Sequence, residues 1–197
     1  PALRAQVAGV ELADSWATDA HKWLNAPYDS GIVIVRERAD LFRAMSAQAA
    51  YVASDDVRQL MALSPHMSQR ARGVEAWALL AARGRDGVAQ LVDDSCAMAG
   101  LFARLLREAG ADVLIAPELN QVPVAFGPTP GTPGNDDITA AVTAAIQADG
   151  TLWAGGSVWR GQKILRISVS DAATTEDDVR ASVDAIVASW DAVREHR

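Results

Sequence analysis

The sequence predicts an α/β protein whose last part is a small α+β domain. In the first part of the chain, short apolar runs that suit strands alternate with segments of helical spacing. One of these strands leads into a polar loop, and open α/β sheets bind ligands at such loops. In the second part, a long helical pattern precedes short strands with the spacing of hairpins. This pattern predicts a small antiparallel sheet with helices on one face.

The elements of the first part follow from the periodicity of its apolar residues and from its turn residues. In chain order we predict a short helix or turn at 3–10, strands at 11–18 and 32–36, and helices at 39–46, 57–63 and 67–82. The polar loop after the first strand covers residues 19–22. Residues 47–56 are small or polar without clear periodicity, which predicts a longer loop.

The second part begins after two glycines, and we place the domain boundary between residues 87 and 88. Here we predict a helix at 88–109, strands at 112–116 and 121–126, a helix at 136–147, strands at 151–159 and 163–170, and a last helix at 175–193. Asn135 suits the N-cap of one helix, and Thr174 or Thr175 suits that of the last. Residues 160–162 are typical of a hairpin turn.

The composition is that of a globular chain without a membrane segment or a basic surface. Half of the 197 residues are hydrophobic, which is enough for one sizeable core or two small ones. Charged residues and glycines interrupt the apolar runs before the roughly 18 residues that suggest a membrane span. The net charge of -7 is dispersed, which argues against a nucleic-acid partner. The single Cys96 cannot form an internal disulfide, so we expect a cytoplasmic protein.

Lysine is rare in this chain, and this makes Lys22 conspicuous. Of the 18 basic residues, only Lys22 and Lys163 are lysines. Arginine cannot replace lysine where an amine must lose its proton, because the guanidinium stays protonated. Lys22 is therefore a candidate for amine chemistry. A tolerated surface lysine would give the same pattern.

The segment from Gly9 to Leu24, which contains Asp19-Ala20-His21-Lys22-Trp23, resembles the cofactor-binding segment of the pyridoxal-phosphate-dependent decarboxylases of amino acids. This group (group II) includes aromatic-amino-acid and glutamate decarboxylases. The resemblance continues through 68–77 and 165–168. It implies a fold-type-I, transferase-like architecture in which residues 1–87 end the large cofactor-binding domain and 88–197 form the small C-terminal domain. It also implies a lyase of amino-acid and carboxylic-acid metabolism that acts as a homodimer.

The resemblance assigns roles around Lys22 residue by residue. Lys22 matches the lysine that holds pyridoxal phosphate as a Schiff base until the amino-acid substrate displaces it. His21 and Asp19 match positions that face the cofactor phosphate. A carboxylate would repel that phosphate, and many members have asparagine at the position of Asp19, so Asp19 could instead orient His21. A structural imidazole is the alternative for His21. No metal site is predicted.

More distant residues are assigned by the same resemblance. Tyr51 matches a mobile-loop tyrosine that protonates the carbon left by carbon dioxide, although an ordinary surface tyrosine is the alternative. Arg166 matches an arginine near the active site that can pair with a substrate carboxylate, yet it could also be a solvated residue of its strand. Ser68 could touch phosphate. Arg70 and Arg72 resemble a stretch at the dimer interface, with a solvated helix face as the alternative.

The expected activity is decarboxylation of an L-amino acid, aromatic or acidic. The acidic partner of the pyridine nitrogen and the residue that stacks on the ring precede this segment in the family, so we expect an N-terminal remainder of the large domain to supply them. Two alternatives stay open. One is a related lyase or aldehyde-forming enzyme with the same cofactor, and the other is a non-catalytic dimerisation fragment of the same fold.

Overall fold

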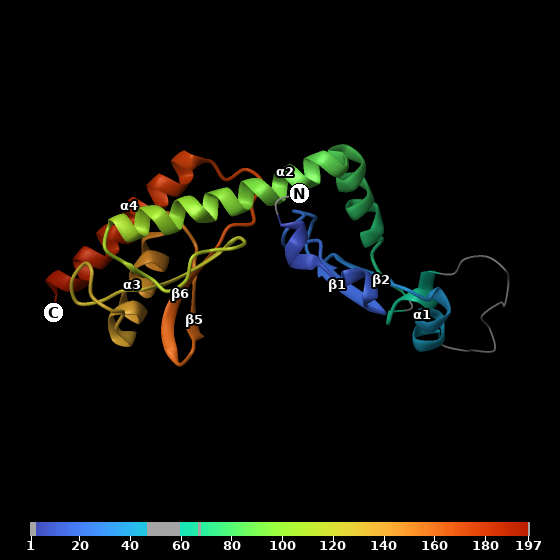
Figure 1. The fold of residues 1–197 in the computed structure, drawn as a ribbon, viewed down its shortest axis with the longest axis horizontal. Helices are drawn as coiled ribbons and strands as arrows, with labels where there is room; N and C mark the ends of the chain where they lie inside the picture. Colours follow the sequence, from blue (N-terminus) through green and yellow to red (C-terminus); the bar gives the residue numbers. More distant parts are fainter. Residues whose placement is uncertain (1–2, 47–59, 67, 197) are drawn as a thin grey trace. The chain divides into compact units, whose positions relative to one another are not determined.

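A computed structural model describes residues 3–46, 60–66 and 68–196 of the chain (Figure 1). The chain forms two compact units, which we call unit 1 (Pro1–Arg85) and unit 2 (Asp86–Arg197). The predicted loop residue Tyr51 lies outside the described residues.

Unit 1 is organised around a two-stranded antiparallel ribbon. Strands β1 (Ser15–Asp19) and β2 (Gly31–Val35) pair in register from Ser15 opposite Val35 to Asp19 opposite Gly31. The other elements of unit 1 before residue 72 are η1 (Arg4–Val7), η2 (Val10–Leu12), α1 (Arg38–Met45) and η3 (Leu60–Leu63). The strand predicted at 11–18 begins later than expected, because the chain forms a 3-10 turn at Val10–Leu12.

Helix α2 (Arg72–Glu108) runs from unit 1 into unit 2 and is interrupted at Gly84. Gly84 has φ 62° and ψ -174°, a backbone conformation that glycine adopts far more readily than other residues. The helical path therefore consists of two segments that meet at this glycine. This agrees with the two helices predicted at 67–82 and 88–109, although the first begins five residues later than predicted.

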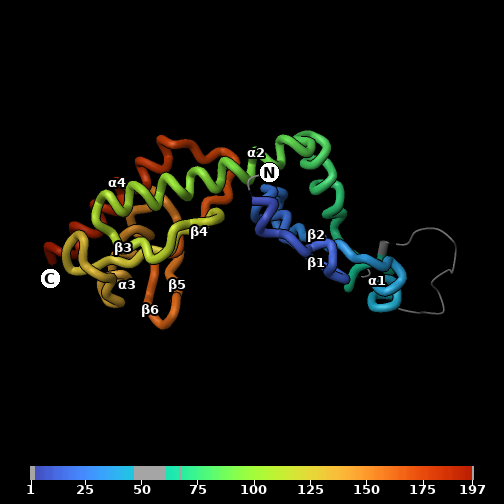
Figure 2. Tube along the Cα trace, in the orientation of Figure 1, coloured from blue at the N-terminus to red at the C-terminus, as the bar shows by residue number. Residues whose placement is uncertain are grey.

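Unit 2 contains a four-stranded antiparallel sheet with the strand order β3-β4-β6-β5 (Figure 2). Its strands are β3 (Asp112–Val113), β4 (Gln121–Ala125), β5 (Gly155–Trp159) and β6 (Gln162–Ser168), and its helices besides α2 are α3 (Asp136–Asp149) and α4 (Glu176–Glu195). The predicted small antiparallel sheet is confirmed. Each of its four strands is shorter than predicted at one end.

One face of this sheet packs against the helices and forms the core of unit 2. Leu165, Ile167 and Val169 alternate along the chain on this face, while Arg166 and Ser168 between them are exposed. The helices contribute buried residues to the same core, among them Phe102, Leu106, Ile138, Val142, Ile146, Val183, Ile186 and Trp190. Burial of this continuous apolar cluster stabilises unit 2.

Local signals at helix ends and turns agree with the sequence. The Asn135 side chain accepts hydrogen bonds from the backbone N–H groups of Asp137 and Ile138, as expected of an N-cap. Thr175 and Asp178 form a reciprocal capping box at the start of α4, so Thr175 and not Thr174 is the N-cap. The hairpin between β5 and β6 is also confirmed.

Candidate functional site

The polar loop predicted after the first strand is a compact turn that connects β1 to β2. The His21 N–H donates to the Ser30 carbonyl at 3.1 Å, and the Ala26 N–H donates to the Ala20 carbonyl at 3.0 Å. Ala20 and Ala26 are buried. We call residues 20–30 the anchor loop. Its backbone is fixed at both ends by the ribbon, and hydrogen bonds within the loop bring its two arms together.

Lys22 lies at the outer side of the anchor loop. Its amine donates a hydrogen bond to Oδ2 of Asp19, and 63% of its side chain is exposed. This hydrogen bond, together with the charges of Lys22 and His21, lowers the pKa of Asp19 despite an opposing effect of desolvation. Asp19 thus contacts Lys22 directly, a contact that neither role considered for Asp19 from the sequence had included.

His21 is held by the far arm of the anchor loop. Its Nδ1 lies 2.8 Å from the carbonyl oxygen of Ser30 and 3.2 Å from the Ser30 nitrogen. A protonated Nδ1 donates to the carbonyl, and an unprotonated one accepts from the N–H, so the tautomer decides which bond forms. Tyr28 packs edge-on against the imidazole with ring centroids 4.5 Å apart. Among the residues that the structure describes, these contacts involve Nδ1 and the ring and not Nε2, so the ring is oriented without use of Nε2.

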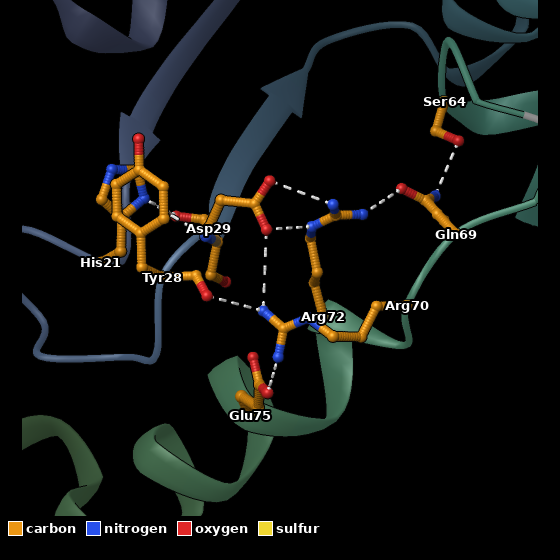
Figure 3. Close-up of polar contacts among 9 residues, drawn as sticks. His21, Tyr28, Asp29, Ser64, Gln69, Arg70, Arg72 and Glu75 are labelled. Atoms are coloured by element: carbon orange, nitrogen blue, oxygen red, sulfur yellow. Dashed lines mark hydrogen bonds and ion pairs between the residues drawn. The ribbon is translucent and has the colours of Figure 1, made fainter.

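A charged cluster ties the anchor loop to the start of α2 (Figure 3). The Asp29 carboxylate accepts two hydrogen bonds from the Arg72 guanidinium, from Nε at 2.9 Å and from Nη2 at 3.0 Å. Arg70 donates to the Tyr28 carbonyl at 3.2 Å, approaches Asp29 at 3.8 Å and forms an ion pair with Glu75. Four charged side chains therefore connect residues that are about 40 positions apart in the sequence.

The electrostatics of this cluster favour an ionised Asp29. The hydrogen bonds from Arg72 are the main cause that lowers the pKa of Asp29 to about 2, with smaller contributions from a backbone hydrogen bond and from the charges of Arg72 and Arg70. The same hydrogen bonds raise the pKa of Arg72. Gln69 extends the cluster, because its oxygen accepts from Arg72 at 2.9 Å and its nitrogen donates to Ser64 at 2.8 Å.

Asp29 is absent from the site residues predicted from the sequence, and Arg72 was assigned to an interface or a solvated helix face. The side-chain contacts join Arg72 to the anchor loop of the same chain, and its place at a dimer interface stays a prediction. Arg70 likewise contacts Tyr28, Asp29 and Glu75. An acidic residue two positions before the strand Gly31–Val35 and an arginine at the start of a helix are the sequence signals, and neither indicates that the two meet.

The predicted site residues fall into three groups. Lys22, His21 and Asp19 lie together in or beside the anchor loop. Ser68 is exposed in the segment that precedes α2, also in unit 1. Arg166 is in unit 2, on the exposed face of β6 between Pro123 of β4 and Gly155 of β5. The placement of Tyr51 is outside the described residues.

The described residues were also considered for metal sites and membrane-spanning helices. Residues 3–46, 60–66 and 68–196 contain no group of three or more His, Cys, Asp or Glu side chains that could hold a metal ion. Within the same residues, no helix combines the length and the apolar character needed to cross a membrane.

Known proteins that are similar to this chain include two decarboxylases and an aldehyde synthase. Tyrosine decarboxylase 2 of Narcissus pseudonarcissus is 20% identical over 187 residues, which cover 91% of this chain and 37% of that protein. Catharanthus roseus tryptophan decarboxylase, solved in complex with L-tryptophan, is 21% identical with a TM-score of 0.82 over 98% of this chain and 42% of that one. Rhodiola rosea 4-hydroxyphenylacetaldehyde synthase is 16% identical with a TM-score of 0.80 over 98% and 40%.

These matches confirm the predicted fold class and show that the chain spans about 40% of the length of its relatives. The sequence model of the pyridoxal-dependent decarboxylase conserved domain matches residues 1–127, which include the anchor loop, the charged cluster and the start of the unit 2 sheet. This match covers well over half of the 197 residues. The chain belongs to the pyridoxal-dependent decarboxylase family.

Proposed function

We propose that this chain supplies the cofactor anchor of a pyridoxal-phosphate-dependent decarboxylase that acts on an aromatic or acidic L-amino acid. The observation that carries the proposal is the position of Lys22, an exposed amine on a braced loop beside an oriented imidazole, in a chain of this family. Lys22 would hold the cofactor as a Schiff base. When bound, pyridoxal phosphate supplies an electron sink for the pair left on the α-carbon after decarboxylation.

The residues of the anchor loop fit an aldehyde cofactor that carries a phosphate. The Lys22 amine is accessible, as attack on an aldehyde requires. His21 is held through Nδ1. When Nδ1 accepts from the Ser30 N–H, the ring proton is on Nε2, which could donate a hydrogen bond to a phosphate oxygen. Asp19 forms an ion pair with Lys22, and we propose that this contact orients the side chain before the cofactor arrives. The ion pair must break and the ammonium must lose a proton before the amine can attack the aldehyde. Ser68 is a further candidate for the phosphate.

The roles of Tyr51 and Arg166 belong to the same proposal. Tyr51 would return a proton to the α-carbon, since a phenol can act as a general acid when it is held against the reacting atom. The guanidinium of Arg166 offers two parallel donors to a substrate carboxylate, and its exposed position on β6 leaves it accessible. An acidic substrate would use this contact more than an aromatic one.

The proposal includes additional polypeptide against unit 1. The β1–β2 ribbon exposes apolar side chains on both faces: Trp16 and Ile34 are partners on one face, and Val33 lies on the other. Strands that are apolar on both faces are typical of sheets covered on both sides. We propose that the remainder of a large cofactor-binding domain covers the ribbon, that unit 2 is the small C-terminal domain and that the protein is a homodimer.

A second candidate function is formation of an aldehyde from the same substrates. The match to 4-hydroxyphenylacetaldehyde synthase shows a shared fold and leaves the reaction open. Tyr51 favours decarboxylation, because the amine product requires a proton donor at the α-carbon. Tyr51→Phe is therefore expected to shift the product from amine toward aldehyde, and an unchanged amine yield would remove the proposed role of Tyr51.

A cytoplasmic location is also proposed, since Cys96 is a free thiol.

The decisive experiment uses the two lysines of the chain as a matched pair. Pyridoxal phosphate is added to the natural full-length protein, and the visible absorbance band of the Schiff base is recorded. Lys22→Ala is expected to abolish the band and the release of carbon dioxide from amino acids. Lys163→Ala is the control, because Lys163 is an exposed lysine of unit 2. An equally strong band with Lys22→Ala would overturn the assignment of Lys22.

A further inference from the structure

We propose that the Asp29–Arg72 ion pair is a positioning device that holds the anchor loop, and with it His21 and Lys22, in the arrangement that receives the cofactor. This inference rests on the proposed function of Lys22. Neither residue is expected to touch the reacting atoms. Arg72, at the start of α2, fixes the position of Asp29. Asp29 in turn fixes the positions of its neighbours Tyr28 and Ser30 in the loop.

The geometry of the pair is specific. Two nitrogens of one guanidinium reach the two oxygens of one carboxylate, at 2.9 and 3.0 Å, which fixes both the distance and the orientation of Asp29. Gln69 accepts a hydrogen bond from the third nitrogen of Arg72 and so limits rotation of the guanidinium. A lysine at position 72 could supply the charge but not the planar pair of donors.

The two neighbours of Asp29 are the residues that hold the imidazole. Tyr28 packs its ring against that of His21, and the backbone of Ser30 contacts His21 Nδ1. Arg70 adds a hydrogen bond to the Tyr28 carbonyl. Figure 3 shows the carboxylate of Asp29 facing the two arginines while the Tyr28 ring lies over His21. A displacement of Asp29 therefore moves both contacts of the residue that precedes Lys22.

A purely stabilising role predicts a different outcome. The pair is partly exposed, with 55% of the Asp29 side chain and 26% of the Arg72 side chain accessible. Exposed ion pairs contribute little to global stability, because water and salt screen them. The effect of breaking this pair should accordingly be found in the anchor loop and in cofactor binding rather than in the unfolding of the whole protein.

The test uses the natural full-length protein and compares four variants: Asp29→Asn, Arg72→Gln, Arg72→Lys and the Asp29→Asn/Arg72→Gln double variant. The matched control is Arg104→Gln, which breaks the exposed Arg104–Glu108 ion pair on α2, also at 2.9 Å, within unit 2. Hydrogen exchange without cofactor is measured on peptides that cover residues 20–30. Asp29→Asn and Arg72→Gln are expected to speed exchange there several-fold, and Arg104→Gln is expected to leave it unchanged.

Cofactor binding is the second readout, followed by the Schiff-base band during titration with pyridoxal phosphate. The single variants Asp29→Asn and Arg72→Gln are expected to weaken binding several-fold, with Arg72→Lys in between. The double variant should be no weaker than the worse single one, because both changes remove the same interaction. Thermal unfolding without cofactor should differ little among all variants.

The outcomes separate this inference from the function on which it rests. If the unmodified protein forms no band, the proposed function fails and the role of the ion pair fails with it. If the band forms, depends on Lys22 and is equally strong in Asp29→Asn and Arg104→Gln, the function stands and the positioning role is overturned. Faster loop exchange without weaker cofactor binding also overturns it, because the loop would then be held for another reason.

Discussion

Different interactions stabilise unit 1 and unit 2, each within itself. Unit 2 has a continuous apolar core that includes Trp190, Phe126 and Leu106, all nearly inaccessible to water. Among the described residues of unit 1, the buried side chains are small: Ala20, Ala26 and Ser30. The order of the anchor loop comes instead from hydrogen bonds and ion pairs. The candidate chemistry thus lies in the unit that has less apolar core of its own.

This difference explains how the candidate site can be both ordered and adjustable. The side chains of a packed core resist displacement, because they are so closely packed that a volume change of even one methylene group is destabilising. Polar contacts of partly exposed side chains can break and re-form at lower cost, and local opening is easiest where few apolar contacts hold a segment. In the proposed function Lys22 changes its partner from Asp19 to the cofactor, and a polar setting suits this exchange.

The core of unit 2 gives the largest expected effect. Trp190 is 1% exposed, donates a hydrogen bond to the Gly127 carbonyl at 2.9 Å and packs edge-on against Phe126. Trp190→Ala should lower the free energy of unfolding by about 3–5 kcal/mol, measured by urea denaturation. Trp153→Ala, at a position that is 80% exposed, is the control and should change it by about 0.5 kcal/mol or less. Equal effects would contradict the assignment of the core.

A helix cap in unit 2 gives a smaller effect. Thr175→Ala removes the side-chain half of the capping box of α4 and should cost about 1 kcal/mol of unfolding free energy. Thr174→Ala is the matched control, because the neighbouring threonine is not the N-cap. A loss that is as large for Thr174→Ala would place the cap one residue earlier. Urea denaturation of both variants under the same conditions makes the measurement.

The smallest expected effect concerns the pH dependence of the anchor loop. The pKa of Asp29 is about 2, below the ordinary value of about 3.9 for an aspartate. Stabilisation from a carboxylate with a lowered pKa is complete above the ordinary value and is lost as the pH falls toward the lowered one. Arg70, Arg72 and Glu75 are the charged groups around it, and both arginines stay protonated throughout this range.

Hydrogen exchange of residues 20–30, corrected for the intrinsic effect of pH, is therefore expected to be constant from pH 7 to pH 4 and to rise below pH 4. Asp29→Asn should be fast at every pH and should lack this change. A rise that already occurs between pH 7 and pH 5 would mean that a group other than Asp29 controls the loop. The comparison between the units would then need a different polar contact as its basis.

Much of the fold could be predicted because its signals are local. The strand predicted at 163–170 is confirmed as β6, and its Leu165 and Ile167 lie in the core of unit 2. The strand predicted at 11–18 was too long at its start, because apolar residues at Val10 and Leu12 fit a 3-10 turn as well as a strand. The ends of elements depend on hydrogen bonds that periodicity does not specify.

The candidate site divides in the same way. His21, Lys22 and Asp19 are neighbours in the sequence, so a motif could identify them together. Asp29 and Arg72 are 43 positions apart and belong to a loop and a helix, whose meeting depends on the path of the chain between them. No periodicity or spacing encodes such a contact. The charged cluster could therefore be identified only from the structure, whereas the pair of Lys22 and His21 could be identified from the sequence.

The separation of Asp29 from Arg72 has a consequence during synthesis of the protein. The chain grows at about 5–20 residues per second, so the ribosome makes the anchor loop roughly 2–9 seconds before it adds Arg72. During this interval Asp29 has no guanidinium from α2 to pair with. If the ion pair positions the loop as proposed, a nascent chain that has already exposed Lys22 still lacks this arginine, and the loop acquires its cofactor-binding arrangement only after Arg72 has been added.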